Sequence, residues 1–224
     1  MPDSAKRKVV LNTVTCWIAI GLTSFIVGTW GMARLVPFLA CNDPVDAEIL
    51  IIEGWLAPAY MPTVLEEFRK GKYHHLFVVG NCQPSGQEQN ALCDTKSAVQ
   101  ILTQLGLEPS LVTAVTVRPT RFHKTWSYAL ALREHIVSSG YKVKTANVLS
   151  LWVHARKSLV VFQKGLGQEI RVGVIAARHQ EFATEHWWLS PRGIYAVVKN
   201  GVAYLDALFL TGWGDTLTHG TTRR

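Results

Sequence analysis

The sequence contains few of the residues that build metal centres and disulfide-rich folds. Only 4 of its 224 residues are cysteine, and neither a Cys-x-x-Cys pair nor a His-Glu-x-x-His motif occurs. The chain therefore offers no local zinc motif. Cys82 and Cys93 bracket the polar segment NCQPSGQEQNALC, which leaves two states open: a disulfide that closes this loop in an oxidising compartment, or two free thiols.

Charge is absent from a long stretch near the N-terminus. Residues 9–33 contain no Asp, Glu, Lys or Arg, and this run exceeds the roughly 20 apolar residues that cross a bilayer. Lys6, Arg7 and Lys8 precede it, and the positive-inside rule keeps such a cluster in the cytoplasm. We expect residues 1–36 to form a cytoplasmic tip and one transmembrane helix, with the rest of the chain outside the cytoplasm. A cleaved signal peptide is the alternative, although its apolar core usually spans about 7–15 residues.

The remainder of the chain has only a small excess of positive charge. Residues 42–224 hold 19 Lys and Arg against 15 Asp and Glu, out of a net charge of +7 for the whole sequence. No basic stripe interleaved with aromatic residues occurs, so nucleic acid is not an expected partner. The bilayer, contacted through residues 9–33, is the first partner that the sequence predicts.

Short apolar runs alternate with amphipathic segments from residue 46 to residue 210. The runs at 48–52, 75–79, 112–117, 146–149 and 171–176 are typical of buried strands, and each is followed by a segment with helical spacing. This alternation predicts an α/β fold: a three-layer, Rossmann-like parallel sheet of about five strands, with one N-terminal transmembrane helix. Residues 37–45 would be a linker, and residues 211–224 a flexible tail.

Chemically active side chains follow the ends of the predicted strands. Glu53 closes the first strand and His179 follows the fifth. Ser150, His154 and Arg156 lie at the junction of the fourth strand and its helix, with a turn expected at Ser150. Because the carboxyl ends of parallel strands form one edge of a sheet, we expect these groups to share a crevice.

These residues predict an anion-binding site with acid/base chemistry. We assign His154 and Glu53 as candidate catalytic residues, and Arg156 as the clamp for an anion. The other candidate ligand-binding residues are Gly54, Gly80, Thr125, Ser150 and His179. A buried arginine here would favour an ionised Glu53 and a neutral His154. The expected ligand is an anionic small molecule, nucleotide-like or a glycan precursor.

Other interpretations of the same residues remain open. Glu53, His154 and His179 could converge on one ion in a metal-assisted hydrolase. Ser150 could cap a helix, Glu53 could be a turn residue paired with a nearby basic side chain, and His179 could lie on a surface loop.

The C-terminal part of the chain is rich in aromatic and aliphatic residues. Trp187 and Trp188 either pack under the sheet edge or form a contact patch. A final helix is expected at 193–210, and its apolar stripe consists of Ile194, Val198, Val202, Leu205 and Phe209. With these features the chain could instead be a non-catalytic scaffold that contacts the membrane or a partner.

Five short motifs, in order, resemble the SanA/ElyC/YdcF family. The opening DAEILII at 46–52 resembles the family's D-A-I-V-V-L-G, and FRKGKY at 68–73 and Gly106-Leu107 match segments before the second and third strands. Thr125 lies where that family begins a helix with N-T-x-E-N, and the run from Ser150 to Arg156 resembles T-S-x-x-H-x-x-R-A. Glu53-Gly54-Trp55 replaces the family's glycine-rich tip.

The resemblance implies a Rossmann-like domain at the bacterial inner (plasma) membrane, facing the periplasm. It also implies a role in cell-envelope or peptidoglycan biogenesis. It names no defined reaction and no cofactor.

Overall fold

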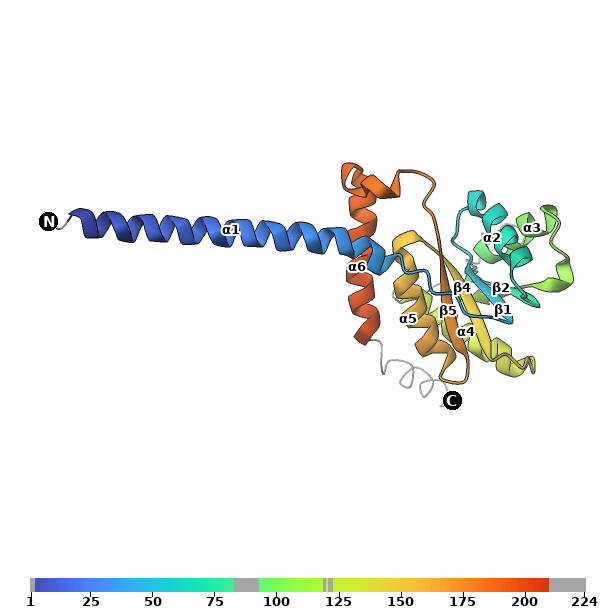
Figure 1. Cartoon of the computed structure of the whole chain (residues 1–224). Helices are drawn as coiled ribbons and strands as arrows, with labels where there is room; N and C mark the ends of the chain where they lie inside the picture. The colour runs from blue at the N-terminus through green and yellow to red at the C-terminus, as the bar shows by residue number, and fades with distance from the viewer. Residues whose placement is uncertain (1–2, 83–92, 119, 121–122, 210–224) are drawn as a thin grey trace. The chain divides into compact units, whose positions relative to one another are not determined.

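The computed structural model describes residues 3–82, 93–118, 120 and 123–209. The chain divides into two units, Met1–Phe38 and Leu39–Arg224. Helix α1 (Asp3–Leu39), labelled in Figure 1, forms the described part of the first unit, and its last residue, Leu39, belongs to the second. Its stretch Thr15–Leu39 is long and apolar enough to cross a membrane, with a mean hydropathy of 1.5. By length and composition, the expected transmembrane segment is thus present, while its orientation stays a prediction.

The second unit is the α/β domain that the sequence predicts. Its strands are β1 (Ile49–Glu53), β2 (His75–Asn81), β3 (Val112–Val117), β4 (Thr145–Leu151) and β5 (Arg171–Ala177). Its helices are α2 (Met61–Lys70), α3 (Asp94–Gln104), α4 (Lys124–Ser138), α5 (Ala155–Leu166) and α6 (Pro191–Phe209). All four strand pairings in the sheet are parallel, and the strand order is β3-β2-β1-β4-β5.

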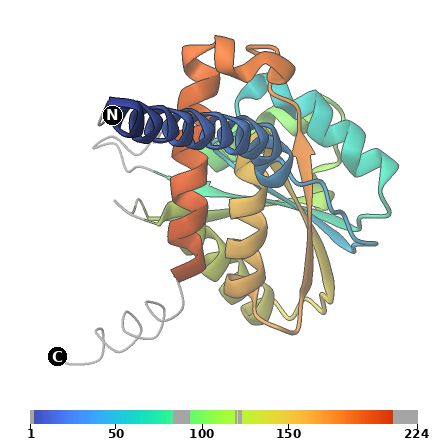
Figure 2. The same ribbon diagram turned by 60° about the vertical axis from the view of Figure 1, so that its left-hand side comes forward.

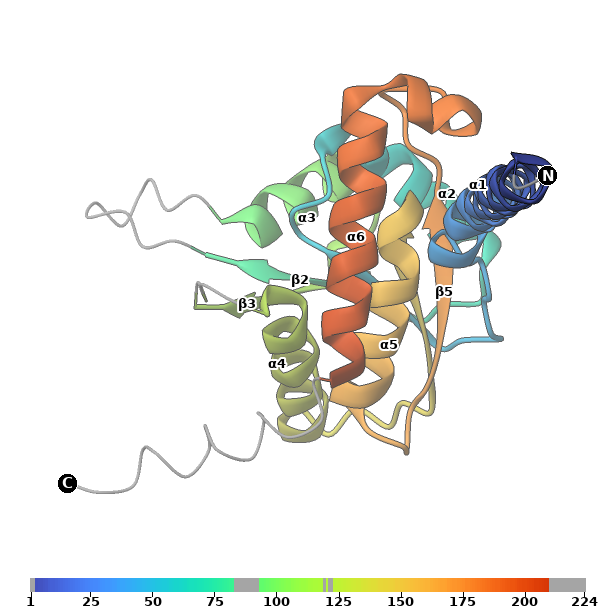
Figure 3. The ribbon, with the colours of Figure 1, turned by 90° about the vertical axis from the view of Figure 1, so that its left-hand side faces the viewer.

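The sheet is buried on both faces, which explains the unbroken apolar runs of its strands. Successive side chains of a strand point to opposite faces. Ile49 and Ile51 therefore join a core with α4 and α5, and Leu50 and Ile52 join a second core with α2 and α3. Helix α6 packs on α5, outside this three-layer arrangement (Figures 2 and 3).

The segment expected as a linker, residues 37–45, is largely fixed to the domain. Helix α1 continues to Leu39, and Asp43 exchanges two backbone hydrogen bonds of 2.9 and 3.0 Å with Val174 of the edge strand β5. The buried side chain of Asn147 accepts a hydrogen bond from Val45 N at 2.9 Å and donates one to Val45 O at 2.8 Å. Residues 39–45 therefore form a strap along the sheet edge. The strap pairs with backbone groups of β5 that would otherwise be exposed to another strand.

Two local expectations were wrong. Ser150 is a buried residue inside β4 rather than a turn or a helix cap, since the strand continues to Leu151 and a 3-10 turn, η4 (Trp152–His154), comes before α5. The helical spacing of Val99, Leu102 and Leu105 predicts that all three lie on the core face of one helix, but Leu105 lies beyond the end of α3 and is 40% exposed.

The structure decides between the two states of the cysteine pair. Cys82 and Cys93 are joined by a disulfide, so the alternative of two free thiols was wrong. The bridge connects the residue after β2 to the residue before α3.

Candidate functional site

The order of the strands creates a crevice at the carboxyl edge of the sheet. From β1 the chain moves outward to β2 and β3, and it then returns to place β4 on the other side of β1. Open α/β sheets bind ligands at such a switch point. A cavity of about 530 Å³ lies there. The lining residues used below are Asn81, Asp94, His123, Lys124, Thr125, Trp126, Trp152, His154, Lys157, His179, Lys199, Asn200 and Asp206.

Glu53 and His154 meet beside this cavity. Glu53 is the last residue of β1 and is 2% exposed, and His154 ends the 3-10 turn that follows β4. The distance from His154 Nε2 to Glu53 Oε2 is 3.3 Å, outside hydrogen-bond geometry but within ion-pair range. Ser158 Oγ donates a 3.2 Å hydrogen bond to the same carboxylate oxygen. The two residues proposed as an acid/base pair are therefore in contact.

The electrostatic surroundings keep Glu53 ionised. Burial alone would raise the pKa of this carboxyl, because a charge is costly to remove from water. The positive charge of His154, and after it that of Lys157, outweighs burial and lowers the pKa of Glu53 to about 2. The sequence also predicted an ionised Glu53, but it assigned the ionised state to the charge of Arg156. Arg156 is not among the causes of the lowered pKa of Glu53.

Asn200 of α6 orients His154. Its Nδ2 donates to Ala196 O at 2.8 Å, which leaves Oδ1 as the acceptor at 2.7 Å from His154 Nδ1. His154 Nδ1 therefore carries a proton. The Nε2 of a neutral ring would then present a lone pair to Glu53, so their contact is attractive only when Nε2 is protonated as well. The arrangement therefore turns the second ring nitrogen, Nε2, toward a carboxylate.

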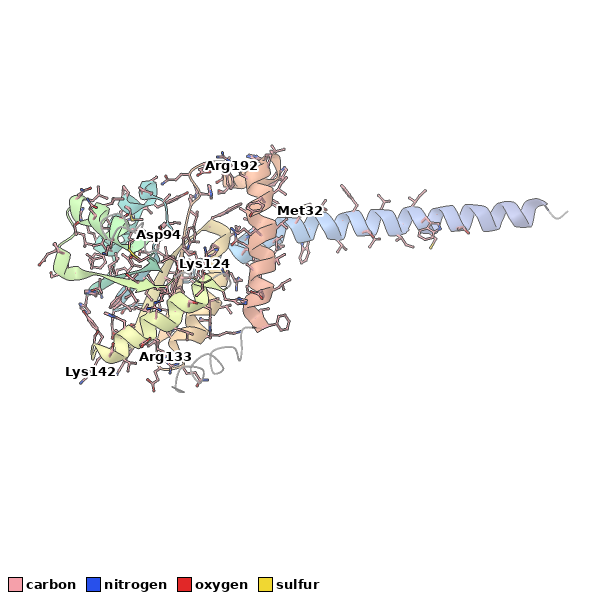
Figure 4. The ribbon with its side chains drawn as sticks, turned by 180° about the vertical axis from the view of Figure 1, so that it is seen from behind. Met32, Asp94, Lys124, Arg133, Lys142 and Arg192 are labelled. Atoms are coloured by element: carbon pink, nitrogen blue, oxygen red, sulfur yellow. A yellow bond between two sulfur atoms is a disulfide. The ribbon has the colours of Figure 1, made fainter. Side chains whose placement is uncertain are left out.

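A lysine supplies the positive charge next to this pair. Lys157 Nζ donates a 3.2 Å hydrogen bond to Thr125 Oγ1 at the start of α4. Burial lowers the pKa of Lys157, and the attraction of Glu53 opposes this change. Lys124 and Lys199 also line the cavity. Figure 4 labels Lys124 at the start of α4 and Lys142 beyond the other end of this helix.

Acidic side chains balance part of this charge. Asp94 and Asp206 also line the cavity, and His123 Nδ1 lies 3.2 Å from Asp206 Oδ2. The site is therefore polar with charges of both signs, and Lys157 is the lysine whose charge lowers the pKa of Glu53.

Two residues at the cavity have a strained backbone. Within the described part of the chain, the non-glycine residues with positive φ are His123 (51°) and Trp152 (42°). Both line the cavity. Left-handed conformations cost non-glycine residues roughly 1–3 kcal/mol and tend to occur at functional sites.

Unpartnered polar atoms gather at the same place. Four buried side-chain atoms lack a hydrogen-bond partner among the described residues, and they are Glu53 Oε1, Asn81 Oδ1, Trp126 Nε1 and His154 Nε2. Three of these residues line the cavity, and the fourth, Glu53, contacts one of them. Buried polar groups are normally paired, so these atoms indicate where a ligand or water binds.

Arg156 does not lie where the anion clamp was expected. It is not among the described residues that line the cavity, and its charge acts instead on Cys41, where it opposes the rise in pKa caused by burial. Successive residues of a helix point about 100° apart. The neighbouring Lys157 therefore faces the cavity, and Arg156 faces the side of the domain where Cys41 is buried.

Three other predicted ligand-binding residues have mainly packing roles. Ser150 Oγ lies 3.1 Å from Ser158 Oγ, behind Glu53. A Cβ on Gly54 would come within 3.2 Å of Thr95 N, and one on Gly80 within 3.1 Å of Thr95 Cγ2. These glycines therefore allow the start of α3 to pack directly on the tips of β1 and β2.

Thr125 and His179 do line the cavity, as expected of ligand-binding residues. His179 stacks on Phe182 with ring centroids 4.2 Å apart, and burial lowers its pKa. It does not join Glu53 and His154, because the described residues contain no group of three or more His, Cys, Asp or Glu side chains able to hold one ion. The alternative of a metal site formed by these three residues was wrong.

Sequence reasoning missed Asn200, Lys157, Asn81 and Trp126. A signal was present for Asn200, because Lys199, Asn200 and Asp206 are polar residues within an otherwise apolar stretch of the helix. Local sequence offers no comparable signal for the other three residues.

No protein-family model, curated protein or solved structure matches this chain. The resemblance to the SanA/ElyC/YdcF family therefore rests on the short motifs alone.

Proposed function

We propose that the chain is a membrane-anchored protein of bacterial cell-envelope biogenesis, acting on peptidoglycan or surface polysaccharide. Its α/β domain binds an anionic small molecule at the carboxyl ends of the strands. The observation that carries the binding proposal is the set of unpartnered buried polar atoms around the cavity of about 530 Å³. A cavity of this size, with a few convergent polar groups, has the features of a small-molecule site.

The chemistry of the cavity defines the class of ligand. Trp126 Nε1 donates, Asn81 Oδ1 accepts, and the Lys157 ammonium attracts negative charge. A ligand that satisfies all three groups carries hydroxyl or amide groups as well as an anionic group. Nucleotide-like molecules and glycan precursors have this combination.

The Glu53–His154 pair adds a means of moving a proton. Glu53 stays ionised at neutral pH, since its pKa is about 2, and Asn200 fixes the ring of His154. Asn200 holds Nδ1 of His154, and Nε2, 3.3 Å from Glu53 Oε2, makes no hydrogen bond with the described residues, so Nε2 is the nitrogen available for general acid/base catalysis. We propose that His154 exchanges a proton with the bound ligand and that Glu53 stabilises the imidazolium.

Titration calorimetry of the full chain in detergent tests the binding proposal. The probes are inorganic pyrophosphate, UDP-N-acetylglucosamine and uncharged N-acetylglucosamine. The anionic probes should bind more tightly, and Lys157→Met should weaken their binding roughly tenfold or more, since a hydrogen bond to a charged group contributes about 1.5–3 kcal/mol. Lys142→Met, at an exposed lysine away from the cavity, is the matched control. Equal losses in both variants would contradict this site.

The location proposed is the inner membrane, with the domain in the periplasm. The candidate span, the basic residues ahead of it and the Cys82–Cys93 disulfide support this location, because disulfides persist in oxidising compartments. A reporter that is active only in the cytoplasm, fused after Arg224, should be silent. Full reporter activity would overturn the orientation and leave the binding proposal standing.

A further inference from the structure

The outer face of α6 is apolar along its whole length. The face consists of six residues that are 44–80% exposed, namely Ile194, Tyr195, Val198, Val202, Leu205 and Phe209. These positions recur every three or four residues, so they form one stripe along the helix. The sequence identified most of this stripe, and the structure shows that it faces away from the domain.

The domain uses the opposite side of the same helix. Ala196, Asn200 and Ala203 line the cavity, and Gly193, Val197 and Ala207 are buried or closely packed. The charged residues Lys199 and Asp206 lie on the cavity side of the stripe. A helix on a water-exposed surface normally presents its polar residues outward, and α6 does the reverse. An apolar stripe of this extent marks an interaction surface.

The point where the membrane anchor joins the domain indicates what covers this stripe. The candidate span ends at Leu39, which is 1% exposed within the domain. Leu39 packs on α6, since its Cδ1 would be 4.0 Å from a Cβ added to Gly201. Gly201 directly precedes Val202 of the stripe. Leu39, the first residue of the second unit, therefore lies against the helix that carries the stripe.

We propose that the outer face of α6 lies in the interfacial layer of the bilayer, beside the point where the anchor leaves it. The residues at the start of α6 suit this layer. Trp188 is 51% exposed just before the helix, and Lys199 Nζ lies 5.7 Å from the centre of the Tyr195 ring. Arg192, which pairs with Glu181, is an exposed basic side chain at the start of the helix. Aromatic and basic side chains of this kind are enriched where protein meets lipid headgroups. The occupant is thus the lipid surface, not a soluble protein.

Fluorescent labelling of the full chain in vesicles tests this proposal. The parent carries Cys41→Ala, so that this buried cysteine cannot take up the dye, and it keeps the Cys82–Cys93 disulfide unreduced. An environment-sensitive dye is attached at position 202 in one variant (Cys16→Ser, Val202→Cys). The matched control (Cys16→Ser, Val137→Cys) uses a valine on α4 that is 74% exposed. The parent itself, labelled at Cys16 in the span, reports insertion of the anchor.

The vesicles contain equal parts of phosphatidylcholine and phosphatidylglycerol, with and without lipids that carry a quencher near the headgroup. We expect the dye at position 202 to lose most of its fluorescence to the quencher lipids, while the dye at position 137 loses little. Equal quenching at positions 202 and 137, or exposure of position 202 to a water-soluble quencher, overturns the proposal. Protection of position 202 from both quenchers, with energy transfer between labelled copies, would mean that a second copy covers the face and also overturns it. Lack of quenching at Cys16 would remove the anchor on which the proposal depends.

Discussion

The substitution Glu53→Gln tests whether His154 or burial controls the charge of the buried carboxylate. The pKa of Glu53 falls from its ordinary 4.5 to about 2 in the folded chain. A carboxyl whose pKa is lower in the folded state stabilises the fold above its unfolded-state pKa, and this contribution is lost as the pH falls toward the folded-state pKa. The two pKa values correspond to about 3 kcal/mol, of which about 2 kcal/mol should disappear between pH 6 and pH 3.

The assay is urea unfolding of the full chain in detergent at several pH values, followed by near-ultraviolet circular dichroism. The quantity compared is the difference in unfolding free energy between wild type and Glu53→Gln. All other titrating groups are shared, so its change with pH reports Glu53. Glu134→Gln, at an exposed carboxylate on α4, is the matched control.

Two results would refute the reasoning. A wild-type advantage that stays constant from pH 6 to pH 3 would mean that the pKa of Glu53 is not lowered on folding. An advantage that grows as the pH falls would mean that burial prevails and the folded-state pKa is raised. In a His154→Ala background the pH dependence of the Glu53→Gln effect should diminish or reverse, because the largest favourable charge is gone.

Two further predictions concern the frame of the domain. Gly173→Ala should destabilise the domain by about 1–3 kcal/mol in thermal unfolding, because the new Cβ would lie 2.6 Å from Val45 N in the strap at the sheet edge. The control Gly201→Ala, whose Cβ makes only an ordinary contact in a helix, should be neutral or stabilising by up to about 1 kcal/mol. An equal loss of stability in both variants would contradict this packing. Replacing Cys82 and Cys93 together by alanine should lower the free energy of unfolding by about 3 kcal/mol, since the bridge closes a short loop. Thiol reagents should miss both cysteines in native, unreduced protein, and labelling of either would contradict the bridge.

The fold class could be predicted because it depends on local patterns. Apolar runs alternating with amphipathic segments specify strands and helices, and strands joined through helices pair in parallel. Parallel strands end at one edge, so Glu53 and His154 could be placed in the same region from sequence alone. The uncharged run near the N-terminus predicted the candidate span for a similarly local reason.

The composition of the site depended on spatial relations that local patterns do not contain. The order β3-β2-β1-β4-β5 makes β1 and β4 neighbours, and this pairing brings Glu53 within 3.3 Å of His154. Asn200 contacts His154 only because α6 packs on α5 and on the 3-10 turn η4 that ends at His154. The choice of Lys157 over Arg156 as the cavity cation follows from the rotation of α5 about its axis, which packing of its apolar face determines.

Helix α6 shows most clearly what the sequence determines and what only the tertiary structure decides. The sequence by itself determined that residues near 193–210 form a helix with an apolar stripe, because the spacing follows the helical period. Only the tertiary structure decided that this stripe faces outward. The domain packs against the small residues on the other side, such as Gly193 and Ala207, which allow close approach of the helix, and Asn200 on that side gains a buried partner in His154. Amphipathic spacing identifies the two sides of a helix, but the shape and polarity of the neighbouring surface select the side that is buried.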